Sequence, residues 1–289
     1  MYGKLIVRIL SKFLVISLGI ICIGAFVGLF TYEINLSFSQ YLKNILHIFK
    51  ALMNPEEIMV SRFSSKSYPM FPLFWEPYFY SMRIFLAALA VTFFAGFLLA
   101  FLTSLLPRKL SGIVYKVFTF FESIPDLFIL LIIQYGTIVY YKKTGILLFD
   151  VAGYDEKVFA LPIITLSILP TLLLYRIIFM LMEEESIKNY VEFAQSKGFS
   201  KNYIILKHII QNLLFSVLNH FKSIILLILS TLVIFERLFN VYGITHFIMT
   251  YPQMEVICLG LIMFYLPIFI LLTCLALLVK RSTGQEVHV

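Results

Sequence analysis

Three long runs without a single charged residue limit what this chain can fold into. They cover residues 13–30, 84–106 and 256–279. The middle run has 23 residues, and as an α-helix it is about 35 Å long at about 1.5 Å per residue. The hydrocarbon core of a bilayer is about 30 Å thick, so each run can cross it. The runs therefore predict transmembrane helices.

The composition excludes an ordinary soluble domain. Hydrophobic residues make up 61% of the 289 residues and charged residues 13%, whereas soluble domains are about 25% charged. The formal charge of +7 reflects the Lys and Arg that membrane proteins carry on cytoplasmic loops, so we expect no nucleic-acid partner. Cys22, Cys258 and Cys274 lie in apolar runs without metal-ligand spacing. No Gly-x-x-x-x-Gly-Lys-Ser/Thr string occurs, so we expect the chain not to hydrolyse ATP by itself.

The order of apolar and polar stretches predicts an all-α, polytopic membrane protein with six transmembrane helices and cytoplasmic N- and C-termini. Residues 1–30 form a first span that is too long for a signal-peptide core. Residues 31–79 form an extracytoplasmic segment with an amphipathic helix, which serves either as a docking surface for an external protein or only for interfacial packing. Residues 80–281 form a five-helix core that includes the loop 183–212, and residues 282–289 form a cytoplasmic tail. The short basic turns Arg108-Lys109 and Lys280-Arg281 indicate cytoplasmic ends.

Glu122, Asp126 and Arg176 lie within the predicted spans, and Glu236 lies directly after one. Glu122 and Asp126 lie one helical turn apart around Pro125, in a third span of about residues 116–141. A charge at the bilayer centre costs roughly 2.5–3.5 kcal/mol, so such carboxylates face a bundle interior or a watery cavity, unless they reach the headgroups near the helix end. Arg176 can pair with one of them or extend to the inner surface, and we expect the latter. Glu236 follows the fifth span.

The loop 183–212 is the longest polar stretch in the second half of the chain and predicts a short amphipathic helix. Ser186 can cap it, and Gly198 can end it in the left-handed conformation. Ser200 can cap the next helix. The expected apolar face consists of Ile187, Tyr190, Val191 and Ala194, and the expected polar face of Lys188, Glu192, Gln195 and Ser196.

The same loop resembles the EAA-xxx-G loop of bacterial ABC-importer permeases. Glu192-Phe193-Ala194, then Gly198, then His208 follow that pattern. A longer string is similar to the oligopeptide/dipeptide/nickel branch of binding-protein-dependent permeases, and it comprises Tyr190-Val191, Ala194, Lys197-Gly198, Lys207-His208 and Asn212. Other matches are Ser123-Ile124-Pro125, Leu161-Pro162, Glu236 with Phe239 and Gly243, and Tyr251-Pro252.

The resemblance implies a transporter subunit of the bacterial cell membrane, not an enzyme, that moves peptides or a similar small solute by alternating access. Its partners would be a second, different permease subunit, two cytoplasmic ATPase subunits that bind ATP and Mg²⁺, and an extracytoplasmic substrate-binding protein. This chain would bind no cofactor or metal and hold no catalytic residue. The ATPase-coupling loop would use Tyr190, Val191, Glu192, Ala194, Lys197, Gly198, Lys207 and His208. The translocation pathway would use Glu122, Asp126, Arg176 and Glu236.

Departures from the family pattern leave other interpretations open. Phe193 replaces the second small residue of EAA, Tyr242 replaces a proline before Gly243, and Thr245 replaces a second glycine. The main alternative is an ion-coupled secondary transporter that uses the intramembrane charges, although no internal repeat of the kind common in such proteins is visible. The five histidines are scattered without ligand spacing, which argues against a membrane-embedded enzyme. The loop on its own also fits an ordinary amphipathic connector on the lipid surface.

Overall fold

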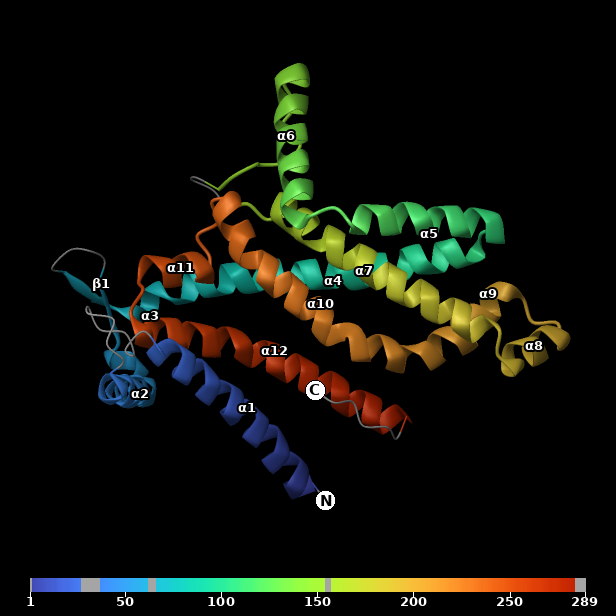
Figure 1. Ribbon diagram of the computed structural model, residues 1–289. Coiled ribbons are helices and arrows are strands. Elements are labelled where there is room, and N and C mark those ends of the chain that lie inside the picture. The colour runs from blue at the N-terminus through green and yellow to red at the C-terminus, as the bar shows by residue number, and fades with distance from the viewer. Residues whose placement is uncertain (1, 27–36, 62–65, 154–156, 284–289) are drawn as a thin grey trace. The chain divides into compact units, whose positions relative to one another are not determined.

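The computed structural model describes residues 2–26, 37–61, 66–153 and 157–283, and these residues are almost entirely helical (Figure 1). The chain divides into two compact units. The first comprises Met1–Met82 and Tyr242–Leu275, and the second comprises Arg83–Val241 and Ala276–Val289. The helices α4 (Trp75–Leu105) and α12 (Met254–Thr283) each contribute residues to both units.

The first unit combines the N-terminal part of the chain with residues Tyr242–Leu275. Its elements are α1 (Tyr2–Ala25), α2 (Phe38–Met53), η2 (Pro55–Glu57), β1 (Met59–Ser61), β2 (Ser67–Pro69), α3 (Met70–Leu73), α11 (Ile244–Thr250) and parts of α4 and α12. Ile21, Ala25, Ile48 and Cys258 pack together in its core. The predicted amphipathic helix is α2, and the hydroxyl of Ser37 caps it by accepting from the Gln40 amide.

A short β-hairpin follows α2, in a segment for which we predicted an amphipathic helix and no strand. β1 and β2 pair in antiparallel register, with Val60 opposite Tyr68. The side-chain amide of Gln253 donates to the carbonyl oxygen of Ser61 over 3.0 Å and so ties the hairpin to the segment before α12. Strands of three residues carry too little alternation to be read from a sequence.

The second unit is built around α7 (Ala160–Ser186), the helix with buried side chains along most of its length. Its other elements are α5 (Arg108–Glu122), α6 (Asp126–Thr144), α8 (Asn189–Ser196), α9 (Lys201–Ile204), η3 (Ile205–Ile209), α10 (Ile210–Leu238) and the rest of α4. Aromatic contacts join these helices: the Phe118 ring lies against Tyr175 of α7, and the Phe93 ring stacks on Phe221 of α10. Gly96 lets α4 approach α7, since a Cβ there would lie 3.0 Å from the Leu174 side chain.

Within the described residues, five helices are long and apolar enough to cross a membrane. They are Val7–Ala25, Trp75–Leu105, Ala160–Ser186, Ser216–Leu238 and Met254–Leu277. A sixth is possible if α5 and α6 count as one bent span. This confirms the all-α, polytopic fold, whereas the side of the membrane on which the termini lie stays a prediction. The end of the first predicted span, residues 27–30, lies outside the described residues.

The third predicted span differs from the expectation of one continuous helix. α5 ends at Glu122 and α6 begins at Asp126, with an angle of 94° between them, and α6 projects away from α5 in Figure 1. Pro125 explains the break because it lacks an N–H and disfavours helical geometry at Ile124. Glu122 and Asp126 therefore belong to two helices, and the prediction that they share one helical face is wrong.

Candidate functional site

Two groups of polar residues in the second unit coincide with the residues singled out from the sequence. One is the loop that joins α7 to η3 and α10, and it contains α8 and α9. The other surrounds the break between α5 and α6. α7 and α10 take part in both groups, because α8 lies between them in sequence and each carries one residue that bonds to the break.

Glu185, not Ser186, organises the start of the loop. α7 continues through Ser186, whose hydroxyl donates to the carbonyl oxygen of Glu183 within the last turn, so the predicted cap is wrong. The Glu185 carboxylate instead binds the ammonium of Lys188 and accepts from the Tyr190 hydroxyl over 2.6 Å. These contacts bridge the turn, and α8 begins at Asn189 after an extended Lys188. Burial and the Glu185 carboxylate raise the pKa of Tyr190 to about 12.

α8 has one buried and one exposed face. Val191 and Ala194 are 2% and 6% exposed, as predicted for the apolar face. Ile187, expected on the same face, is instead 84% exposed because it lies in the turn before α8. On the outer face, Phe193 is 61% exposed and the Lys197 ammonium lies 4.3 Å from its ring centroid. The helix thus presents an aromatic and charged surface while two small apolar residues hold it in place.

Gly198 ends α8 in the left-handed conformation, which confirms the prediction. Its φ is +83°. Its N–H donates to the carbonyl oxygen of Gln195 over 2.9 Å, and the Phe199 N–H donates to that of Ala194 over 3.3 Å. This pair of bonds is the Schellman arrangement, which satisfies carbonyls at a helix end. Ser200 then caps α9 by accepting from the Tyr203 amide, also as predicted.

Lys207 and His208 lie in η3, a π-helical turn between α9 and α10. Lys207 is exposed, and the half-buried His208 ring lies 5.9 Å from the Tyr203 ring centroid, next to the segment that follows Gly198. π-Helical turns are rare and are frequent at functional sites. No local pattern predicts this turn, since its residues also fit an ordinary helix.

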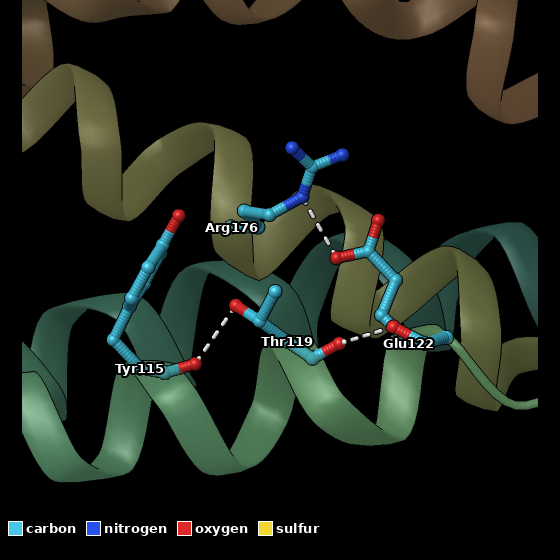
Figure 2. A network of polar contacts seen from close by, with 5 residues as sticks. Tyr115, Thr119, Glu122 and Arg176 are labelled. Atoms are coloured by element: carbon cyan, nitrogen blue, oxygen red, sulfur yellow. Dashed lines mark hydrogen bonds and ion pairs between the residues drawn. The ribbon is translucent and has the colours of Figure 1, made fainter.

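An ion pair links the end of α5 to α7 (Figure 2). The Arg176 Nε donates to Glu122 Oε2 over 2.7 Å. The expectation that Arg176 extends to the inner surface is therefore wrong; it pairs with one of the two carboxylates instead. In the last turns of α5, the Thr119 hydroxyl donates to the Tyr115 carbonyl oxygen and the Ser123 hydroxyl to that of Thr119. Such back-bonding often bends helices, and it adds to the effect of Pro125.

A second polar contact links the start of α6 to α10. The Thr231 hydroxyl donates to Asp126 Oδ2 over 3.0 Å. Asp126 is also in the first turn of α6, where the helix dipole favours a carboxylate. Glu236 lies five residues further along α10 and is 1% exposed. The two ends of the break are thus held by different helices, α7 and α10.

The contacts of both groups hold helix ends in defined positions. Within the described residues, no three His, Cys, Asp or Glu side chains gather as metal ligands. The loop carries a short helix whose two ends are fixed by hydrogen bonds, and the break is a bend held by two polar contacts.

Comparison with known proteins gives one family. The family of the binding-protein-dependent transport system inner membrane component matches residues 70–284, which include the loop and the break. No curated protein matches the chain.

Proposed function

Because the chain belongs to the family of binding-protein-dependent transport system inner membrane components, we propose that it carries a peptide or a similar small solute and that α8 couples this transport to separate ATPase subunits. The family indicates the permease subunit of an ABC importer. This subunit is a multi-pass membrane protein. Members work with ATPase and binding-protein subunits. The solute, the role of α8 and the composition of the assembly are our proposal.

The observation that carries the coupling proposal is the construction of α8. It is a two-turn helix fixed at its start by the Glu185 contacts and at its end by Gly198. Its inner face is buried, and Glu192, Phe193 and Lys197 remain exposed. A helix held this way transmits force, because it cannot rotate without breaking these contacts. We therefore assign the exposed face to the ATPase.

The proposed mechanism uses the two helices that α8 connects. An ATPase that moves α8 moves the end of α7 and, through α9 and η3, the start of α10. Both helices reach the α5–α6 break, through Arg176 and Thr231 respectively. The two contacts then differ between inward-facing and outward-facing states. ATP and Mg²⁺ bound by the ATPases shift this equilibrium only as far as the coupling interaction differs between the states.

We place the translocation pathway beside the charged residues of the membrane-embedded part. Glu122, Asp126, Arg176 and Glu236 are costly in lipid and are expected to face the interior of the assembly. The remainder of the assembly would be a second, different permease, two ATPases and an extracytoplasmic binding protein in a bacterial cell membrane. The basic residues at the predicted inner ends support cytoplasmic termini.

The test compares two exposed phenylalanines. Phe193 on α8 is 61% exposed and Phe120 on α5 is 67% exposed, so replacing either by Ala removes a similar surface without opening a core. We expect ATPase subunits to co-purify with the tagged wild-type chain and with Phe120→Ala, and to be lost from Phe193→Ala. Mass spectrometry of the purified material identifies them.

Two results would overturn the proposal. If Phe193→Ala retains the ATPases, α8 is not the coupling helix. If the chain transports solute without any nucleotide-binding partner, the ion-coupled secondary transporter becomes the better description of the molecule.

A further inference from the structure

A cavity of about 320 Å³ lies against α8. Val191 and Gln195 of α8 line it, together with residues from the facing ends of α4, α5, α7, α9 and η3. We propose that this cavity binds a phosphate group, carried by a lipid headgroup or by a small soluble phosphate. Nothing in the coupling mechanism requires such a site.

Two cations give the cavity its positive charge. Arg108 at the start of α5 and Lys201 at the start of α9 both line it. Within the described residues neither forms an ion pair, and Glu183 is the one carboxylate in the lining. Arg presents a planar fork of donors that matches phosphate oxygens, and Lys supplies a compact charge. The side chains therefore leave a net positive charge for an anion.

Neutral groups in the lining suit the same ligand. Gln195 contributes an amide that can donate to an anionic oxygen, whereas the hydroxyls of Ser104 and Ser111 already donate to the carbonyl oxygens of Phe101 and Arg108. α5 starts at this cavity after Pro107 without a side-chain cap, so the N–H groups of its first turn remain available as donors. These donors supplement the two cations and do not define the site by themselves.

The remaining walls are apolar. Leu106, Met182 and Ile204 are among the residues that form them. The volume is in the range of small-molecule sites, which begins near 300 Å³. A cavity lined by both cations and apolar side chains fits an amphiphile, and basic pockets between transmembrane helices bind anionic headgroups. A soluble phosphate ester would use the same cations without the apolar walls.

An occupant would contact Val191 and Gln195 of α8 and the ends of α5 and α7 at the same time. If α8 is the coupling helix, which rests on the proposed function, the ligand would stiffen the attachment of α8 to the core. Phosphate binding itself does not depend on that assignment, because it is measured on the chain without ATPases.

The experiment is native mass spectrometry of the full chain in a neutral detergent. The probes are phosphatidylglycerol, phosphatidylcholine and a diacylglycerol without phosphate, with inorganic phosphate and glycerol phosphate as soluble competitors. We expect phosphatidylglycerol to bind most tightly. The Arg108→Gln/Lys201→Gln double variant should raise its Kd by roughly 25-fold, on the scale of about fivefold for each cation.

Controls separate this site from a general surface charge. Lys109→Gln/Lys116→Gln removes two exposed cations of α5 that do not line the cavity, and it should leave the Kd unchanged. Gln195→Glu keeps both cations but adds a carboxylate to the lining, and it should weaken binding several-fold.

The outcomes distinguish the two sources of phosphate. If only the cavity variants lose phosphatidylglycerol binding, and soluble phosphates do not compete for it, the cavity is a lipid site. Competition by inorganic phosphate or glycerol phosphate establishes a soluble ligand. Equal binding by the cavity variants and the controls, or no binding of any phosphate probe, overturns the proposal.

Discussion

Replacing Gly198 tests whether the conformation of the loop matters for coupling. The backbone at this position has a φ of +83°, in a region that only glycine occupies at little cost. A Cβ placed there would meet no atom within 4 Å. A substitution therefore acts through the backbone alone, without a steric clash.

The magnitude follows from that geometry. Alanine in the left-handed conformation costs roughly 1–2 kcal/mol, which is a factor of about 5–30 in the population of the loop conformation. Asparagine tolerates this region and should cost less. Proline fixes φ near −65° and removes the N–H that donates to the Gln195 carbonyl oxygen, so it should abolish the arrangement. We expect affinity for the ATPases to fall in the order Gly, Asn, Ala, Pro, by up to about 30-fold for Ala.

The assay is titration of purified ATPase subunits onto the reconstituted chain, followed by uptake into proteoliposomes. Gly145 supplies the matched control: it ends α6 with a φ of +70°, and a Cβ there would also meet no atom within 4 Å. Gly145→Ala should strain its backbone similarly and leave ATPase affinity unchanged. If Gly198→Pro binds and transports normally, or if Gly145→Ala has the same effect as Gly198→Ala, the reasoning is refuted.

Three further predictions concern single contacts. Glu122→Gln and Arg176→Gln should be non-additive, with a coupling of about 0.5–3 kcal/mol in the free energy of unfolding measured by a double-mutant cycle in detergent; additive effects would mean that the ion pair does not contribute. Ala194→Asp buries a carboxylate under α8 and should destabilise the loop by more than about 2 kcal/mol, seen as faster tryptic cleavage there, whereas the exposed Gln195→Asp should cleave at the wild-type rate. Tyr190 has a folded-state pKa of about 12, above its ordinary value near 10. Its contribution to stability is therefore complete below pH 10 and is lost as the pH rises through 12. Tyrosinate absorbance of the wild type minus that of Tyr190→Phe should titrate near pH 12, and a midpoint near 10 would contradict the contact.

The parts of the site that could be predicted are those set by neighbours in the sequence. A glycine after an amphipathic stretch and a serine before the next helix are local signals, and Gly198 and Ser200 behave as expected. The spacing of Val191 and Ala194 likewise identified the buried face of α8. Most of the transmembrane helices follow in the same way from the length of their apolar runs.

The parts that could not be predicted depend on distant residues or on competition between equivalent local choices. Ser186 and Glu185 can both form contacts at a helix start. In the structure Glu185 does so, because Lys188 and Tyr190 come within reach of its carboxylate. The pairing of Arg176 with Glu122 joins residues 54 positions apart, and no local pattern indicates it. Pro125 indicates either a kink in a span or a break between two helices, and no local pattern distinguishes the two. In the structure the helices separate, and the two flanking carboxylates contact different helices, α7 and α10.

The lengths of α7 and α10 indicate which contact at the break responds first to movement of the loop. Arg176 lies ten residues before the end of α7 at Ser186, about 15 Å of helix, and Pro170 is beyond it, away from the loop. Thr231 lies thirty residues after Lys201, about 45 Å away, and the path includes the π-helical turn η3. A short, regular helix transmits a displacement with less loss than a long one with an irregular turn. The Arg176–Glu122 ion pair is therefore expected to be more strongly linked to α8 than the Thr231–Asp126 bond.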